Sequence, residues 1–216
     1  MNVKMPVWKC CWGGLLAGWL VTACSSGVRL SEPERAGIEQ QTVNIVHYHS
    51  ALPRIEPRTK LAITTPLAIR QHAAADPAAI VAQSFSRLLE KKEKIKNLRV
   101  EAHGLALPVP NSATGYREKF RHGLVLEVWT AGWSFAALPA DPKTYAMTLG
   151  IRTRLTRLAD GQVLWSTGQC RTDGLNNRAL RLPAKELTSG IMLRKLLAAA
   201  RDECARQLVR DFGVRA

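Results

Sequence analysis

The sequence lacks the patterns on which several common functions depend. No apolar run reaches the roughly 18 residues of a membrane-spanning helix, which excludes a chain that crosses the membrane several times. There is no GxSxG nucleophile elbow, no HExxH zinc motif, no Walker loop and no GxGxxG dinucleotide loop. Without a CxxC pair, a zinc cluster is not expected. Acidic residues are scarce as well, since 17 Asp and Glu stand against 31 Lys and Arg, for a net charge of +14.

The remaining titratable residues do not form a recognisable catalytic set. Glu101 and Glu127 fall on different predicted strands, so their spacing does not favour an acid–base pair. Glu127 lies in a hydrophobic run, where we expect it to face solvent or pair with an arginine. His47 and His49 would share one face of a strand, but no third ligand lies near them in the sequence. We therefore expect a protein that is not an enzyme and that has no metal and no cofactor.

The first 24 residues have the order of features found in an export leader. Lys4 and Lys9 supply positive charge before an apolar run over residues 12–21 that is too short to span a membrane. The run LVTAC, which ends at Cys24, resembles the lipobox of bacterial lipoproteins. The resemblance implies cleavage between Ala23 and Cys24, diacylglycerol on the thiol of Cys24, and acylation of the new amine. Residues 1–23 would then be a signal peptide.

The residue after the lipobox indicates where such a protein would be held. Ser25 stands where an aspartate would imply retention in the inner membrane, so the resemblance implies an outer-membrane lipoprotein that faces the periplasm. Because each buried methylene contributes about 0.8 kcal/mol, two or three acyl chains on Cys24 would anchor the chain to the membrane. In that compartment the positive charge favours anionic lipid, lipopolysaccharide, acidic glycan or an acidic protein, and no nucleic-acid partner is expected.

The five cysteines divide between the leader and the body of the chain. Cys10 and Cys11 leave with the leader, and Cys24 carries the lipid. The remaining two, Cys170 and Cys204, are predicted to form a disulfide in an oxidising compartment. In a cytosolic protein the same pair would instead be buried, reduced thiols.

Composition divides the exported chain into two parts. Residues 24–58 contain three prolines and many polar residues, so we expect the lipidated N-terminus and a flexible tether, with one edge strand over residues 42–49. Residues 59–216 are expected to form a single α/β (α+β) domain. Its predicted fold is a mainly antiparallel sheet of four or five strands, with two or three helices packed on one face.

Hydrophobic periodicity locates the elements of this domain. Strands are predicted over residues 61–65, 98–100, 124–130, 147–156 and 162–167, and helices over residues 77–96, 113–121 and 190–212. Asp160 and Gly161 form a strong hairpin signal, and residues 134–143, with two prolines, are predicted to form a loop. In the last helix the apolar spacing places Cys204 on the buried face.

The body of the chain resembles small lipoproteins of Gram-negative bacteria. The resemblance covers residues 76–212 and is carried by GLVLEVWTAGW at 123–133, RLTRLADGQVLW at 154–165, Cys170, and AARDEC at 199–204. These relatives have no established activity to transfer. By order of elements the chain is also similar to periplasmic α/β domains related to the amino-terminal domain of TolB, which occur in lipoproteins that assist polymer export or envelope assembly.

Four arginines are candidates for binding an anion. Arg152, Arg154, Arg157 and Arg171 are predicted to lie on the solvent side of the hairpin, where guanidinium groups suit phosphate or carboxylate. The alternative is that they only keep the surface of the sheet soluble.

Trp133 and Phe135 are candidates for a partner-binding loop, or else they pack under the sheet. The first functional hypothesis is a non-enzymatic accessory or assembly factor that contacts an envelope protein through the sheet edge or this loop. The second is a carrier or binding module for an anionic lipid, lipopolysaccharide or glycan, and an unrecognised hydrolase comes third. A homo-oligomer is compatible with each of these hypotheses.

Overall fold

A computed structural model describes residues 28–48, 52–56, 69, 76–93, 95, 97–100, 113–166 and 170–213. The lipobox with Ala23 and Cys24, His49 and the strand predicted over residues 61–65 lie outside this part of the chain. No helix within it combines the length and the apolar character that crossing a membrane requires.

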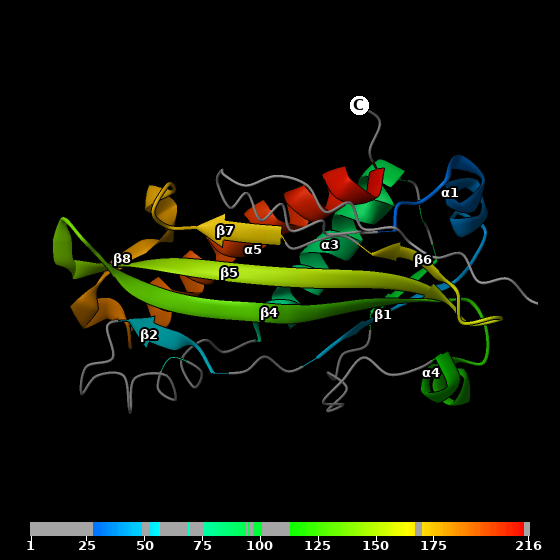
Figure 1. Cartoon of the computed structure of the whole chain (residues 1–216), viewed down its shortest axis with the longest axis horizontal. Helices are drawn as coiled ribbons and strands as arrows, with labels where there is room; N and C mark the ends of the chain where they lie inside the picture. The colour runs from blue at the N-terminus through cyan, green and yellow to red at the C-terminus, as the bar shows by residue number, and fades with distance from the viewer. Residues whose placement is uncertain are drawn as a thin grey trace, which may run out of the picture.

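Two long antiparallel strands form the centre of the sheet (Figure 1). They are β4 (Leu124–Leu138) and β5 (Asp141–Arg157). Side chains alternate along both strands, so one set enters the main core and the other forms what we call the outer face. A bulge between Thr130 and Gly132 interrupts the register of β4, and beyond it Gly132 lies opposite Gly150.

The prediction of a loop over residues 134–143 is wrong, because β4 continues to Leu138 and β5 begins at Asp141. Only residues 139–140 form the turn. The prediction rested on Pro139 and Pro142, and neither one interrupts the paired ladder. Pro139 lies in the turn itself, and Pro142 lies in a stretch of β5 where the register shifts.

The sheet is larger and more mixed than predicted. Its main order is β3-β1-β4-β5-β6, with β2 paired to β4 and with β7 and β8 paired to β5. The further strands are β1 (Val43–His47), β2 (Arg54–Glu56), β3 (Leu98–Val100), β6 (Val163–Ser166), β7 (Cys170–Asp173) and β8 (Arg181–Pro183). β1 runs parallel to β3 and β4, and β2 runs parallel to β4, while the pairs made by β5 are antiparallel. The α+β class is confirmed, and four of the seven strand pairs in the described residues are antiparallel, but the sheet has eight strands rather than four or five.

β1 is an inner strand, so the prediction of an edge strand over residues 42–49 is wrong. It lies between β3 and β4, and all five of its residues are buried. Residues 28–48, which fall in the segment predicted as a tether, therefore include part of the folded core. The alternation of polar and apolar residues suggested an exposed face, but the outer side of β1 is covered by the helix α4 (Ala113–Phe120).

The described helices lie on both faces of the sheet. They are α1 (Glu32–Ile38), α3 (Pro77–Glu93), α4 (Ala113–Phe120) and α5 (Gly190–Gly213), with short 3-10 helices at Arg178–Leu180 and Ala184–Glu186. The α3 helix begins as predicted after Asp76, whose Oδ1 accepts the backbone N–H of Ala78 at 2.9 Å. In Figure 1 α3 and α5 run together along one side of the β4–β5 pair, and α4 lies on the other side.

The main core lies between the sheet and the α3–α5 pair. Phe85 of α3, Trp165 of β6 and Phe212 of α5 form an aromatic group, with ring centroids 5.0 to 6.2 Å apart. The apolar stripe predicted for the last helix is confirmed, because its members are all buried: Leu193, Leu197, Ala200, Cys204 and Leu208.

A second, smaller core lies on the outer face under α4. It consists of Val46, Tyr48, Tyr116, Val125 and Leu158. Tyr116 comes from α4 and is followed one turn later by Phe120, which packs against the same cluster. The prediction that the helices lie on one face is therefore wrong for α4, because its two aromatic side chains pack against the apolar residues at this end of the outer face.

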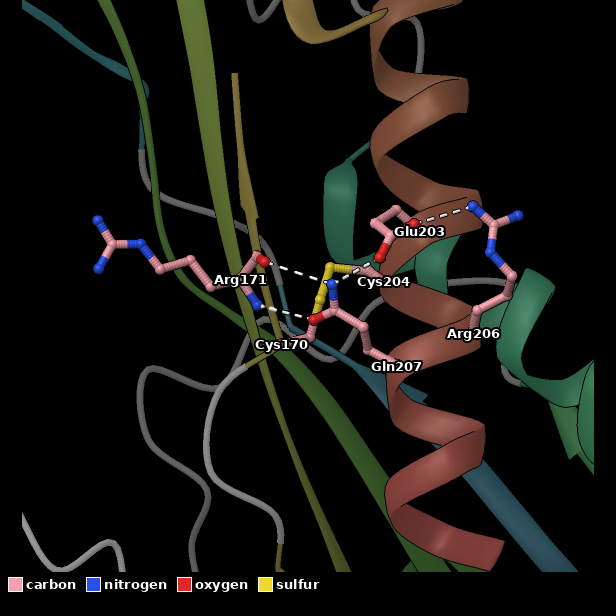
Figure 2. The surroundings of a disulfide bond; sticks show 6 residues. All are labelled: Cys170, Arg171, Glu203, Cys204, Arg206 and Gln207. Atoms are coloured by element: carbon pink, nitrogen blue, oxygen red, sulfur yellow. Dashed lines mark hydrogen bonds and ion pairs between the residues drawn. A yellow bond between two sulfur atoms is a disulfide. The ribbon is translucent and has the colours of Figure 1, made fainter. Parts of the chain in front are cut away.

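The predicted disulfide between Cys170 and Cys204 is confirmed. It joins β7 to α5, with 5.5 Å between the two Cα atoms (Figure 2). Beside it the side-chain amide of Gln207 contacts the backbone of Arg171 twice. Its Oε1 accepts the N–H of Arg171 at 3.3 Å, and its Nε2 donates to the carbonyl of Arg171 at 3.4 Å. The α5 helix is thus attached to the border of β7 both covalently and by hydrogen bonds.

Candidate functional site

The outer face contains three of the four arginines selected from the sequence, Arg152, Arg154 and Arg171. Arg157 lies opposite Leu124 of the main core, so it belongs to the other side of the sheet. Arg154 and Arg157 have acidic partners close by. Within the described part of the chain, the side chains of Arg152 and Arg171 form no ion pair and no hydrogen bond. The predicted array of four therefore divides into two structural arginines and two that can bind something else.

Arg154 is part of a buried polar cluster around Glu127. Its Nε lies 2.5 Å from Glu127 Oε2, and its Nη2 donates to Oε1 at 3.0 Å. The hydroxyls of Tyr48 and Tyr116 also donate to Oε1, each at 2.8 Å. Glu127 is fully buried. The hydrogen bond between Arg154 and Glu127 is the main reason why the pKa of Arg154 is raised. The expectation that Glu127 would face solvent or pair with an arginine is resolved in favour of the pair.

Tyr116 connects this cluster to α4. Burial raises the pKa of Tyr116 above its ordinary value of 10.0, and the neighbouring Glu127 carboxylate raises the pKa further. The hydroxyl therefore stays protonated and remains a donor to Glu127. Together with Arg154, the two tyrosines compensate for burying a carboxylate under α4.

We expect Tyr116→Phe to lower the free energy of unfolding by about 1–2 kcal/mol, because a hydrogen bond to a charged group is lost. Urea unfolding followed by circular dichroism measures this. Tyr145→Phe is the matched control, since Tyr145 is buried without a hydrogen bond in the described residues, and it should change little. The pKa of Tyr116 is higher in the folded chain than in the unfolded chain. Tyr116 therefore contributes its full share of the free energy of unfolding below pH 10.0, and this contribution is lost as the pH rises further. An alkaline decline in stability that is the same in Tyr116→Phe and in the unmodified chain would contradict this assignment.

Arg157 has a local role at the hairpin turn. Its Nη2 lies 2.9 Å from Asp160 Oδ2, and its Nε contacts both carboxylate oxygens at 3.1 Å. The hydrogen bond from Arg157 is the main cause that lowers the pKa of Asp160. Asp160 also accepts the backbone N–H of Gln162, so the carboxylate organises the turn. Arg157 is therefore occupied in the structure of the hairpin.

Arg171 lies beside a hollow in the outer face. The hollow has a volume of about 350 Å³ and lies over the glycine pair at the bulge of β4. Its lining comes from the segment before β2, from β2 and from the three strands β4, β5 and β7: Leu52, Arg54, Glu56, Thr130, Ala131, Gly132, Trp133, Ser134, Thr148, Gly150 and Arg171. Six of these residues are exposed, so the hollow opens on the surface.

The charged groups of the hollow are Arg54, Glu56 and Arg171. Among the described residues none of the three side chains forms an ion pair or a hydrogen bond. Arg54 was missed in the sequence because it falls in the predicted tether, where the alternation of Arg54, Ile55 and Glu56 was too short to indicate a strand. In the structure this alternation is visible as exposed, buried and exposed positions.

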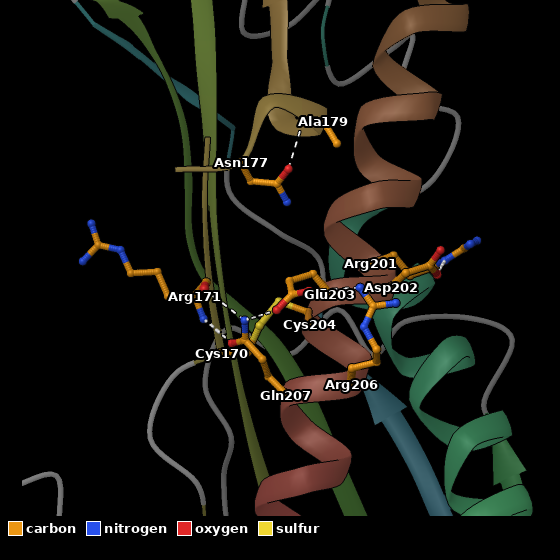
Figure 3. A network of polar contacts seen from close by, with 10 residues as sticks. All are labelled: Cys170, Arg171, Asn177, Ala179, Arg201, Asp202, Glu203, Cys204, Arg206 and Gln207. Atoms are coloured by element: carbon orange, nitrogen blue, oxygen red, sulfur yellow. Dashed lines mark hydrogen bonds and ion pairs between the residues drawn. A yellow bond between two sulfur atoms is a disulfide. The ribbon is translucent and has the colours of Figure 1, made fainter. Parts of the chain in front are cut away.

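The two sides of β7 differ in whether the charged side chains near them form ion pairs. In Figure 2 the side chain of Arg171 extends away from α5 and from the disulfide. On the α5 side the charges are paired locally, with Arg201 Nε at 2.7 Å from Asp202 and Arg206 Nη2 at 3.0 Å from Glu203 (Figure 3). Arg171 therefore adds an uncompensated positive charge to the outer face alone.

Trp133 and Phe135 do not form a loop, so the predicted partner-binding loop is wrong. Both lie in β4, and they are 5% and 0% exposed. Their ring centroids are 6.2 Å apart. The alternative that they pack under the sheet is confirmed, because strand alternation beyond the bulge directs both toward the main core.

The structure offers no metal centre in the part of the chain that it describes. His47 is buried in β1. No group of three or more His, Cys, Asp or Glu side chains in these ranges could hold a metal ion.

Comparison with known proteins gives structural likenesses only. No family model matches the sequence, and no curated protein matches it. A PelC dodecamer from Paraburkholderia phytofirmans is 14% identical over 83% of this chain and 95% of its own, with a TM-score of 0.31. Lipoprotein GNA1162 from Neisseria meningitidis is 14% identical over 77% and 99%, with a TM-score of 0.35. Protein XCC0632 from Xanthomonas campestris is 12% identical over 78% and 81%, with a TM-score of 0.41. Likenesses this loose carry no argument about function.

Proposed function

We propose that this protein is a non-enzymatic accessory lipoprotein of the bacterial envelope, anchored to the outer membrane through Cys24 and facing the periplasm. Its outer sheet face binds another envelope component. The anchor is supported by the lipobox-like leader. The binding role is supported by the hollow at the β4 bulge, where Arg54 and Arg171 carry charge without a partner in the described residues.

The structure favours the outer face over the other contact surfaces considered from the sequence. Trp133 and Phe135 are buried and cannot dock a partner in this conformation. On the border of β7 the outward backbone groups of Arg171 are bonded to Gln207. The outer face beyond α4 stays exposed and positively charged. The two hypotheses therefore combine into one proposal, in which the accessory protein binds its partner through the arginines of the outer face.

The form of the hollow supports surface recognition rather than transport inside the protein. A volume of about 350 Å³ is at the lower end for a small-molecule site, where about 300–1,000 Å³ is usual. It suits a polar head group or a single sugar rather than enclosed acyl chains. We propose that the ligand is anionic and is presented on a lipid, a glycan or a protein of the envelope.

Lipidation is tested by Cys24→Ser. We expect the unmodified chain in the detergent-soluble membrane fraction and the variant in the periplasmic fraction, because the acyl chains supply the membrane affinity. Mass spectrometry of the N-terminal peptide should show diacylglycerol and an acyl group on Cys24. Ser26→Ala, two residues from the same site, is the control for a change at this point of the chain and should stay with the membrane. If the N-terminal peptide of the unmodified chain carries no acyl group on Cys24, the proposed anchor is wrong.

The accessory role is tested by identifying what remains bound after gentle purification from membranes. Mass spectrometry should find one protein, lipid or glycan in stoichiometric amount, or a ring of this chain alone if the partner is a second copy. The double variant Arg54→Glu with Arg171→Glu should lose it. Arg194→Glu with Lys195→Glu, at two exposed positions of α5, is the control with the same change in charge. Retention by the double variant would show that the outer face is not the contact surface.

A further inference from the structure

The floor of the hollow is made by two glycines that face each other across the central strands. Gly132 of β4 is paired with Gly150 of β5, and a Cβ built on Gly132 meets no atom within 4 Å. Two residues along, Ser134 lies opposite Thr148 on the same face. The hollow therefore exists because side chains are missing from its floor, and small hydroxyl groups lie at one end of it.

Two arginines stand on opposite sides of this floor. Arg54 of β2 is registered with Ser134 of β4, and Arg171 of β7 is registered with Gly150 of β5. The strand order across this region is β2-β4-β5-β7, which is three interstrand spacings, or roughly 14 Å between the outer backbones. Both side chains line the hollow, so two guanidinium groups can approach one ligand from opposite sides.

Glu56 is the acidic residue of this lining. It follows Arg54 by two positions and shares its strand face, about 7 Å along β2. A ligand with negative charge alone would be attracted by the arginines and repelled by Glu56. A ligand that carries a cation beside its anion satisfies all three groups.

We infer that the hollow binds a phosphoethanolamine group, with its phosphate between Arg54 and Arg171 and its ammonium at Glu56. Guanidinium groups bind phosphate oxygens in pairs of parallel hydrogen bonds, and a carboxylate accepts from an ammonium. The inference deepens the proposed function and rests on it, because it names the chemistry that the outer face would recognise. Phosphoethanolamine occurs as a lipid head group and as a water-soluble ester, and both present the same two charges.

The first test is calorimetric titration of the full chain, in an uncharged maltoside detergent, with phosphoethanolamine. We expect Arg54→Gln and Arg171→Gln each to weaken binding at least about tenfold, since each removes charge-assisted hydrogen bonds. Gly132→Leu should abolish binding while the fold is kept, because the new side chain enters open space in the hollow. Arg99→Gln is the matched control and should bind within about twofold of the unmodified chain.

The second test concerns the cation. Phosphoethanolamine should bind more tightly than inorganic phosphate, and Glu56→Gln should remove this preference. Titration of the same chain with short-chain phosphatidylethanolamine and short-chain phosphatidylcholine, both below their micellar concentrations, distinguishes a lipid head group from a soluble ester. Tighter binding of the phosphatidylethanolamine than of the ester assigns the site to the head group. Binding in either form supports the inference.

The inference is overturned if no phosphoethanolamine compound binds, or if Gly132→Leu binds as well as the unmodified chain. These measurements use neither the anchor nor a co-purified partner. Their failure therefore leaves the fractionation result for Cys24→Ser intact, and a failure of that fractionation test leaves the titration data intact.

Discussion

Arg154→Ala is expected to lower the free energy of unfolding by about 3 kcal/mol. Removing one member of a buried ion pair costs about 3–5 kcal/mol, because the other charge stays buried without compensation. The lower end applies here, since the Arg154 side chain is 29% exposed and water can reach its site. Glu127 would keep only the two hydrogen bonds from Tyr48 and Tyr116. Urea unfolding at neutral pH, followed by far-ultraviolet circular dichroism, measures the loss.

Two further variants show whether the buried charge is the cause. Arg154→Ala combined with Glu127→Gln should be more stable than Arg154→Ala alone, because glutamine carries no charge into the core. Arg152→Gln removes an exposed arginine of the same strand that has no ion pair among the described residues, and it should leave the unfolding curve unchanged. Equal effects of Arg154→Ala and Arg152→Gln would contradict the role given to Glu127.

Loss of the Cys170–Cys204 disulfide is the second large effect. The bond closes a sequence separation of 34 residues, for which the loop-entropy relation gives about 3–4 kcal/mol of stabilisation. Cys170→Ala with Cys204→Ala should lower the free energy of unfolding by that amount. Thermal and urea unfolding of the oxidised chain and the double variant provide the comparison.

The control for this prediction is reduction of the unmodified chain. Both cysteines are buried, at 4% and 0% exposure, so we expect slow reduction under native conditions and fast reduction in urea. The reduced chain and the double alanine variant should then have similar stability. Rapid reduction of the native protein with no loss of stability would show that the disulfide between β7 and α5 is not needed for stability.

Elements specified by local signals could be predicted from the sequence. Three such elements depend on residues close to them in the sequence: the hairpin at Asp160 and Gly161, the start of α3 at Asp76, and the last helix. The disulfide also followed from its context, since only Cys170 and Cys204 remain once the leader region is set aside.

Features that depend on distant partners could not be predicted in this way. β1 is an inner strand because β3 and β4, far along the chain, pair with it in parallel. Glu127 is buried because α4 covers it with Tyr116, a contact that strand alternation does not reveal. The hollow needs Arg54 and Arg171 to be brought to the same face from β2 and β7, and no spacing in the sequence connects those two strands.

The side-chain amide of Gln207 affects whether copies of this protein can aggregate along the border of β7. An outermost strand presents unpaired N–H and C=O groups that can template another chain and start a fibril. A glutamine amide contains one acceptor and one donor, so at Arg171 it imitates one residue of an incoming strand. The turn after β7 occupies the carbonyl of Asp173 in the same way, with N–H groups of Asn176 and Asn177. Cross-β growth along this border therefore requires α5 to separate from β7 first, and the adjacent disulfide opposes that separation.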